Sequence, residues 1–402
     1  MESLKELYKM GPGPSSSHTM GPQRAAKIFN SKNPDAASFR VHLYGSLAAT
    51  GKGHLTDFII IKTLAPKEVE VVWEPEVVKE FHTNGMKFEA LDADKNITDE
   101  WTVFSIGGGS LAEEGKRGQS SESVYPHDNL EDIIEWCRAN HKNFVDYVKE
   151  YDDDDIMDYL RDIRLTMRQS LEDGLKATEV IPGKLKLARK ARNFYRQYKV
   201  SKQLTSMLYA YALAVSEQNA SGFEIVTAPT CGSAGVLPAV LFTLQDYYGF
   251  DDEAIEEGLA VAGLMGVVVK QNASVSGAEV GCQGEVGVAC AMAAAAAAFI
   301  KGGPLRKIEY AAEIGLEHHL GMTCDPAYGY VQIPCIERNA MGAQRALDAA
   351  NYALLSDGIH HIKFDQIVKI MDETGRDMME KYKETAKGGI ALLYEESGEF
   401  DD

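Results

Sequence analysis

The stretch VGVACAMAAAAAAFI, residues 286–300, is the most apolar part of the chain and decides the fold of its second half. It falls short of the roughly 20 apolar residues that a membrane-spanning helix needs. Alanine has the highest intrinsic helix propensity, and its small side chain lets neighbouring helices approach closely. We therefore expect a buried helix at the centre of a helical domain.

The rest of the chain divides into two patterns. Helical spacing of apolar residues begins near Asn129 and continues to about residue 385. The first third instead contains short runs rich in β-branched residues, which are typical of strands. These runs are FRVHLYG (39–45), FIIIK (58–62), VEVVW (69–73), MKFEAL (86–91) and WTVFSI (101–106). We predict a small α/β (or α+β) N-terminal domain, residues 1–125, followed by a larger all-α domain, residues 126–402.

Length, net charge and the opening residues indicate which partners and which cellular compartment to expect. The chain has 402 residues, of which 45% are hydrophobic, and this length is ample for two domains. Its formal net charge is −19, so we expect neither nucleic acid nor an anionic membrane as a partner. The opening MESLKELYKM has no apolar core of the kind found in secretory signals. We expect a cytoplasmic protein.

Three of the six cysteines lie in glycine- or proline-rich loops. Cys282 lies between glycines in GCQG, Cys324 precedes Asp-Pro, and Cys335 follows a proline. Their separations of 42 and 11 residues match no compact zinc or ferredoxin signature, so spacing alone leaves metal ligation and unconnected buried thiols equally open. Three thiolates would suit an iron–sulfur cube that leaves one iron without a protein ligand, or a zinc ion with an open position.

The other three cysteines have plainer surroundings. Cys137 lies on an amphipathic helical pattern and Cys290 begins the alanine run, so we interpret both as packing residues. Cys231 lies in APTCGSAG, a glycine-rich turn that could bring it near a site, but we do not expect it to be a ligand.

The loop GPGPSSSHTMGP, residues 11–22, concentrates hydroxyl groups around one histidine. These hydroxyls could bind a substrate carboxylate, or they could cap the helix that starts near Pro22. A second histidine, His54, follows in the loop GKGH. Imidazole titrates near neutral pH, as a general base should, so His18 and His54 are both candidates for proton transfer.

Five segments together resemble the iron–sulfur-dependent L-serine dehydratases of the single-chain kind, and the resemblance runs nearly end to end. They are GPSSSHTMGP, YGSLAATGKGHLTD, APTCGSAGVLPAVL, SGAEVGCQGEVGVACAMAAA and LGMTCDPAYGYVQIPCIERNAMGA. The resemblance implies a 4Fe–4S cluster held by Cys282, Cys324 and Cys335, with the other three cysteines as non-ligands. It also implies L-serine as substrate and a homodimer.

The same resemblance implies roles at the active site. The expected reaction is that of an L-serine ammonia-lyase, which deaminates L-serine to pyruvate and ammonia with an open iron as Lewis acid. We interpret His54 as the base and His18 as the substrate-binding partner or acid, and the reverse assignment stays open. The expected substrate-binding residues are Ser15, Ser16, Ser17, Thr19 and Asn272.

Two alternatives remain at this stage. A cluster-dependent cysteine desulfidase would need little change in such a pocket, because a thiol replaces a hydroxyl. A non-catalytic amino-acid-binding protein would need neither a proton-transfer histidine nor an open iron. The sequence also departs from many relatives of the resembled family, which end in a cysteine soon after a GG-[IL]-A segment. Here Gly388–Ala391 is followed by LLYEESGEFDD, without a thiol.

Overall fold

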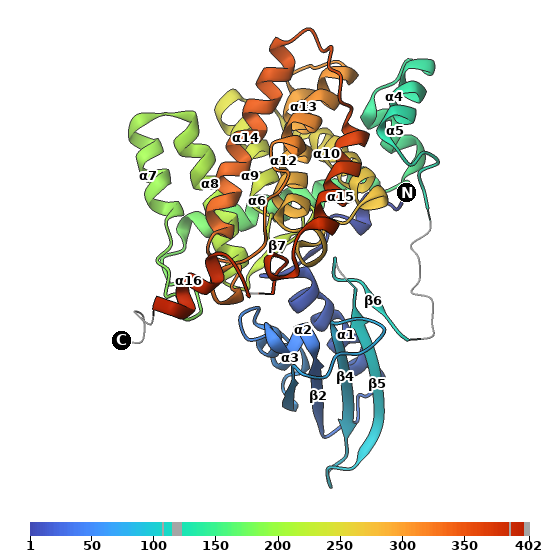
Figure 1. Cartoon of the computed structure of the whole chain (residues 1–402), viewed down its shortest axis with the longest axis vertical. Coiled ribbons are helices and arrows are strands. Elements are labelled where there is room, and N and C mark those ends of the chain that lie inside the picture. Colours follow the sequence, from blue (N-terminus) through green and yellow to red (C-terminus); the bar gives the residue numbers. More distant parts are fainter. Residues whose placement is uncertain (107, 115–122, 386, 398–402) are drawn as a thin grey trace. The chain divides into compact units, whose positions relative to one another are not determined.

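The computed structural model describes residues 1–106, 108–114, 123–385 and 387–397, with only the backbone described for 394–397. The chain forms two compact units (Figure 1). The smaller unit is Gly11–Ser120, and the larger unit combines Met1–Met10 with Ser121–Asp402. This confirms the expected fold class, a small α/β domain followed by a larger helical one.

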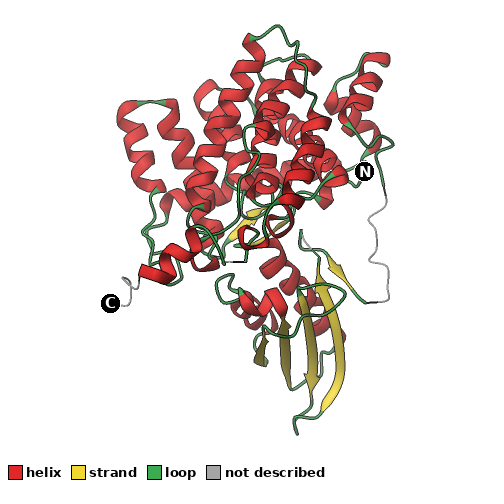
Figure 2. Ribbon diagram, viewed as in Figure 1, coloured by secondary structure: helices red, strands yellow, loops and turns green. Residues whose placement is uncertain are grey.

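A five-stranded mixed sheet forms the smaller unit together with three helices (Figure 2). The strand order is β3–β2–β4–β5–β6; β2 and β3 run parallel, and the other neighbours are antiparallel. The strands are β2 (Ser38–Tyr44), β3 (Glu68–Glu74), β4 (Gly85–Leu91), β5 (Ile97–Ser105) and β6 (Leu111–Ala112). The helices are α1 (Gly21–Lys32), α2 (Gly45–Ala49) and α3 (Thr56–Leu64), preceded by the π-helical turn η2 (Ser16–Met20).

The interpretation of FIIIK (58–62) as a strand is wrong, because these residues lie in α3. Ile59, Ile60 and Leu64 join the core beneath the sheet, whereas Ile61 is 46% exposed. The connection between β2 and β3 explains the helix. Parallel neighbours cannot be joined by a tight hairpin, so the chain must cross over, and crossovers are usually helical.

Helices make up nearly all of the larger unit (Figure 2). They are η1 (Leu4–Glu6), α4 (Leu130–Ala139), α5 (Phe144–Tyr151), α6 (Ile156–Lys176), α7 (Ala191–Ser201), α8 (Leu204–Ala220), α9 (Val236–Tyr248), α10 (Asp252–Asn272), α11 (Gly277–Val280), η3 (Gln283–Gly287), α12 (Val288–Ile300), α13 (Leu305–Glu317), η4 (Ala327–Gly329), α14 (Cys335–Leu355), α15 (Phe364–Asp377), η5 (Glu380–Tyr382) and α16 (Ile390–Ser397). Two short strands, β1 (Met10–Pro12) and β7 (Glu224–Val226), complete the elements.

The alanine-rich helix α12 forms the centre of the larger unit, as the sequence predicts. Every residue from Val288 to Ala298 is buried, and α12 packs against α9, α10, α13 and α14. Close packing depends on small residues. A Cβ added to Gly315 on α13 would lie 2.9 Å from the Cα atom of Ala291 on α12.

One described stretch, Gln283–Ile300, is long and apolar enough to cross a membrane, with a mean hydropathy of 1.5. Within the larger unit, however, 89% of this stretch is buried against other parts of the protein. The core helix of a helical domain has the same length and composition, so this stretch is weak support for a membrane span.

The first ten residues pack with the helical unit, although the expected boundary at residue 125 had placed them in the small domain. The Tyr8 hydroxyl donates to the carbonyl oxygen of Leu259 on α10 at 2.9 Å. The Ser3 hydroxyl donates to the carboxylate of Asp152 at 2.5 Å. These contacts join residues far apart in sequence, which periodicity along the chain does not predict.

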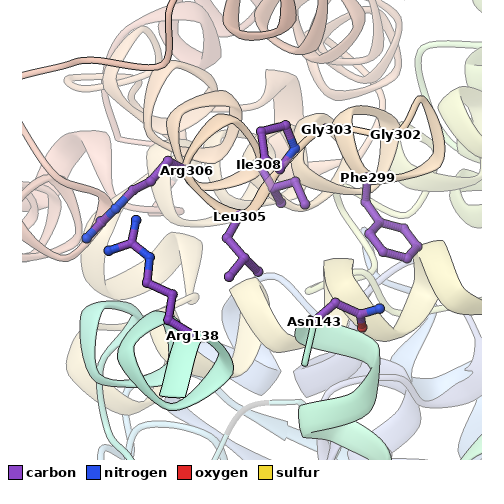
Figure 3. Close-up of a pocket in the computed structure, with 9 residues that line it drawn as sticks. Arg138, Asn143, Phe299, Gly302, Gly303, Leu305, Arg306 and Ile308 are labelled. Carbon is purple, nitrogen blue, oxygen red and sulfur yellow. The ribbon is translucent and has the colours of Figure 1, made fainter. Parts of the chain in front are cut away.

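A cavity of about 470 Å³ opens between α4–α5 and the turn from α12 to α13 (Figure 3). Its lining residues are Arg138, Asn143, Phe299, Gly302, Gly303, Pro304, Leu305, Arg306 and Ile308. None of the residues predicted to form the site is among them.

Candidate active site

Two buried cysteines, Cys282 and Cys324, come together with Glu285 in the helical unit. Cys282 caps η3, which continues directly into α12, and Cys335 is the first residue of α14. The thiol of Cys282 lies 3.5 Å from Oε2 of Glu285, and the thiol of Cys324 lies 3.8 Å from the same oxygen. The ligand atoms of Cys282, Glu285 and Cys324 all lie within 4.8 Å of one another.

Cys335 is close enough to Cys282 for the two thiols to influence each other electrostatically. Burial and the nearby Cys282 side chain raise the pKa of its thiol well above the ordinary value. Arg338 lies one helical turn further along α14, and its Nη1 donates to the Thr323 carbonyl oxygen at 2.7 Å. The nearby Cys282 and Cys335 side chains raise the pKa of Arg338 against the opposing effect of burial. The Thr323 bond links α14 to the loop that carries Cys324.

Asn339 holds two of the loops around the cluster in place. Its side-chain oxygen accepts the amide of Gly235 at 2.9 Å, and its side-chain nitrogen donates to the carbonyl oxygen of Gly232 at 2.7 Å. The same nitrogen donates to the Cys335 carbonyl oxygen at 2.9 Å. Because Asn339 is 1% exposed, these bonds form where water cannot replace them.

Glycines let Glu285 approach the thiols. A Cβ added to Gly277 would lie 2.6 Å from Oε2 of Glu285 and 3.1 Å from the Cys324 sulfur. A Cβ added to Gly232 would lie 3.0 Å from Oε1 of Glu285, which accepts the Thr230 hydroxyl at 2.8 Å. Larger residues at either glycine would displace the carboxylate.

The site carries more acidic groups than cationic ones. Burial raises the pKa of Glu285, and it raises the pKa of Glu384 to about 8 with help from the Glu285 charge. The hydrogen bond with Cys282, followed by burial, raises the pKa of the Cys324 thiol. These groups resist ionisation together because their negative charges would repel one another in a buried place.

This donor set fits a bound metal centre. A metal ion or cluster supplies the positive charge that lets buried thiols ionise, and thiolates are preferred ligands of iron–sulfur clusters and zinc. Cys282 and Cys335 also stand at helix N-termini, whose partial positive charge favours thiolates. Cys282, Cys324 and Cys335 are therefore the residues that would hold such a group.

The remaining cysteines differ in what surrounds them. Cys290 is fully buried in α12, where burial raises its pKa. Cys137 is buried in α4, and burial raises its pKa to about 12. Cys231 lies closer to the site, because the Glu285 charge adds to burial in raising its pKa.

The two predicted catalytic histidines meet in the smaller unit. The ring centroids of His18 and His54 lie 4.4 Å apart. His18 lies in η2, and its Nε2 lies 3.0 Å from the Thr50 hydroxyl. His54 lies in the turn before α3. In the first turn of this helix, the Asp57 carboxylate accepts the amide of Phe58.

Burial keeps both imidazoles in the neutral form. His18 is 3% exposed, and burial lowers its pKa to about 4 against the opposing effect of a hydrogen bond with the Ser46 carbonyl. Burial and the neighbouring His18 lower the pKa of the fully buried His54 well below its ordinary value. A neutral imidazole has the lone pair that a proton acceptor needs.

Two hydroxyls of the histidine loop, those of Ser15 and Thr19, bond to the backbone of the loop itself. Ser15 caps η2 by accepting the His18 amide at 3.2 Å. A loop hydroxyl therefore caps this turn, whereas α1 has no side-chain cap. The Thr19 hydroxyl donates to the carbonyl oxygen of Pro12 at 3.0 Å. Ser16 is buried and Ser17 is half-buried.

Asn272, the fifth predicted substrate-binding residue, lies at the C-terminal end of α10 in the helical unit. Its exposed side-chain amide donates to the carbonyl oxygens of Asp128 at 2.6 Å and Val268 at 2.8 Å.

Sequence reasoning missed the two charged residues of the cysteine cluster. Glu285 lies three residues after Cys282, and Arg338 lies three residues after Cys335. Each cysteine begins a helical turn, and positions three apart on a helix share a face. That spacing was the available signal, because it places a charged side chain beside each thiol.

The helical unit thus contains a group, Cys282, Glu285 and Cys324, that could hold a metal ion, and a small α/β unit precedes it in the sequence. The family model described as the serine dehydratase alpha chain matches residues 69–391, and the model for the beta chain matches residues 3–72. The chain belongs to the serine dehydratase family.

Curated relatives align along almost the whole chain. The L-serine dehydratase of Streptomyces coelicolor is 39% identical over 97% of this chain and 98% of its own length. The L-serine dehydratase of Haemophilus influenzae is 37% identical over 98% and 99%, and that of Helicobacter pylori is 32% identical over 97% and 98%. The similarity therefore covers both units.

Proposed function

We propose that this protein is an L-serine dehydratase, a lyase that deaminates L-serine to pyruvate and ammonia. The proposal rests on family membership and on one observation above all, the meeting of the Cys282 and Cys324 thiols with Glu285 in the helical unit, where Cys335 also senses Cys282. Cys282, Cys324 and Cys335 would hold a 4Fe–4S cluster. When bound, such a cluster supplies an iron without a protein ligand, which acts as a Lewis acid towards the substrate hydroxyl.

The chain's own residues provide proton transfer and orientation. His54 is the proposed base that removes the proton from Cα of serine, and His18 is its proposed substrate-binding partner. Loss of this proton and of the β-hydroxyl gives aminoacrylate, which tautomerises to an imine that water hydrolyses to pyruvate and ammonia. Burial lowers the pKa of both imidazoles and leaves them neutral, so each has a lone pair that can accept a proton.

Ser15, Ser16, Ser17 and Thr19 are proposed to bind the substrate through the loop that carries His18, and Asn272 remains a proposed contact. We also propose a homodimer and a cytoplasmic location, where reducing conditions would keep the six free thiols reduced. Sedimentation of the purified protein and fractionation of cells test these two points.

Anaerobic purification followed by iron and sulfide analysis and a pyruvate assay tests the function. We expect about four iron and four sulfide per chain, as a 4Fe–4S cluster requires, and pyruvate formation from L-serine. L-cysteine is assayed on the same preparation. Faster release of sulfide from cysteine than of pyruvate from serine would identify a desulfidase. A colourless, metal-free protein that binds serine without turnover would identify a non-catalytic binding protein.

A further inference from the structure

The cysteine cluster contains two charged side chains that ligation of a cluster does not use. Cys282, Cys324 and Cys335 are between 2% and 7% exposed, whereas Glu285 and Arg338 keep a larger part of their surfaces accessible. Within the described part of the chain, no direct ion pair joins these two residues. One acidic and one basic side chain, both half-buried, thus stand beside the thiols.

The two carboxylate oxygens of Glu285 have different neighbours. Its Oε1 accepts the Thr230 hydroxyl, whereas its Oε2 is contacted by the thiols of Cys282 and Cys324. Glu285 is half-buried, so part of its carboxylate stays accessible beside the thiols. A carboxylate forms strong, charge-assisted hydrogen bonds with a cationic donor, such as an ammonium group.

Arg338 has donors to spare in the same place. A guanidinium carries five N–H groups in a planar fork, and Arg338 directs one of them to the Thr323 carbonyl oxygen. The remaining N–H groups can bind a carboxylate, for which the fork geometry is well suited. The Thr323 bond fixes the guanidinium next to the loop that carries Cys324.

We propose that Glu285 and Arg338 recognise the two charged ends of the amino-acid substrate, with Glu285 binding the α-ammonium group and Arg338 binding the α-carboxylate. This inference rests on the proposed function, since it names how that site selects its substrate. It adds a specificity element that the hydroxyl-rich loop lacks, because neutral hydroxyls cannot distinguish an amino acid from its uncharged analogues by charge.

The test compares serine with two analogues that each lack one charged end. 3-Hydroxypropionate lacks the ammonium group, and ethanolamine lacks the carboxylate. Dissociation constants are measured by calorimetry on the anaerobic holoenzyme, together with KM and kcat for serine. The variants are Glu285→Gln and Arg338→Gln, with Glu285→Asp and Arg338→Lys as charge-conserving versions. Iron and sulfide content is measured for every variant.

We expect Glu285→Gln to weaken serine binding about 10- to 100-fold, as loss of a hydrogen bond to a charged group does, and to leave 3-hydroxypropionate binding unchanged. Arg338→Gln should weaken serine and 3-hydroxypropionate to a similar extent and leave ethanolamine unchanged. The charge-conserving variants should recover part of the affinity. KM should rise more than kcat falls.

Two neighbours on α14 serve as matched controls. Glu337 is exposed and pairs with Lys190 at 3.0 Å, and Arg345 is exposed further along the helix. Glu337→Gln and Arg345→Gln should leave all three ligands unaffected.

The outcomes separate this inference from the proposed function. If the holoenzyme makes no pyruvate but binds serine with the expected pattern across the variants, the function is wrong and the recognition pair stands. If it deaminates serine and each variant weakens all three ligands equally, or changes only iron content, the two charges merely balance the cluster and the inference is overturned. Absence of serine binding to the holoenzyme overturns it as well.

Discussion

Burial does not distinguish the six cysteines from one another, because all six are buried. The neighbours of each thiol do. Cys290 lies within the alanine-rich helix, and Cys137 directs its thiol to the carbonyl oxygen of Asn143 at 3.4 Å. Cys282 and Cys324 instead share a carboxylate and, with Cys335, lie near a guanidinium. At the residue scale, charged and polar neighbours distinguish the candidate ligands from the packing cysteines.

Single replacement of Cys282, Cys324 or Cys335 by Ala should abolish the brown colour and the activity together, because each removes one of three proposed ligands. Iron analysis and the absorption spectrum measure the first effect, and pyruvate formation the second. Cys137→Ala and Cys290→Ala are the controls and should keep both. A ligand variant with a full cluster and normal turnover would show the assignment to be wrong.

Replacing His54 by Asn should leave the cluster and serine binding largely intact but remove the proposed base. General base catalysis contributes about 10²- to 10⁴-fold, so kcat should fall by that order. Solvent exchange of the serine α-proton, followed by NMR, should disappear with it. Exchange that persists in this variant but vanishes in His18→Asn would reverse the two roles.

Protonation of His18 should destabilise the smaller unit at acidic pH. Its pKa is near 6.5 when unfolded and about 4 when folded, so the unfolded chain binds more protons between these values. Stability from this group is therefore present above pH 6.5 and is lost as the pH falls through 4, up to about 3 kcal/mol in all. Chemical unfolding of wild type and His18→Gln at pH 7 and pH 4.5 measures it. The variant should lose less stability between these pH values than wild type.

At the scale of elements, the sequence predicts whether a segment is a helix or a strand better than it predicts which elements pair. Alternating apolar runs correctly indicated β2, β3, β4 and β5, and the alanine run correctly indicated the central helix α12. FIIIK (58–62) failed because five residues rich in isoleucine suit a strand and a buried helix face equally well. Because β2 and β3 pair in parallel, the segment between them must cross over and forms a helix. A short local run does not show how strands will pair.

The candidate site shows the same limit. The loops that carry Cys282, Cys324 and Cys335 could be predicted from their glycines and prolines, and the resemblance supplied the ligand set. Glu285 and Arg338 could not be predicted to meet, because they lie on different helices and are brought together only by the packing of η3 against α14. Contacts between distant segments depend on the tertiary fold.

Asn339 connects three segments of the site, so its loss should weaken the site more than an ordinary surface change. Asn339→Ala leaves the Gly235 amide and the Gly232 carbonyl oxygen without this partner in a buried place. We expect the free energy of unfolding to fall by about 1–3 kcal/mol, with reduced iron content. Chemical unfolding of the metal-free protein isolates the first effect. Asn351→Ala, an exposed change further along α14, should alter neither.

At the scale of the whole molecule, the larger unit is closed by segments from both ends of the sequence. Near the start, Tyr8 bonds to α10. Near the end, the Cys324 amide donates to the carbonyl oxygen of Tyr382 at 2.8 Å, and the Glu384 amide donates to the Cys324 carbonyl oxygen at 2.5 Å. The Asp325 carboxylate accepts the Ile390 amide at 2.7 Å. The segment 382–390 therefore supports the loop that carries one proposed ligand.

Two truncations test this support. Ending the chain after Tyr394 keeps all three of these bonds and removes an acidic segment of which residues 398–402 lie outside the described structure. We expect the cluster spectrum and the affinity for serine to stay unchanged. Ending the chain after Met379 removes the partners of Cys324 and Asp325, so iron content and activity should fall together, whereas the far-ultraviolet circular dichroism of the helices should change little. A spectral shift on the shorter deletion would show that the acidic segment reaches the cluster. An intact cluster after the longer deletion would show that the Cys324 loop holds its shape unaided.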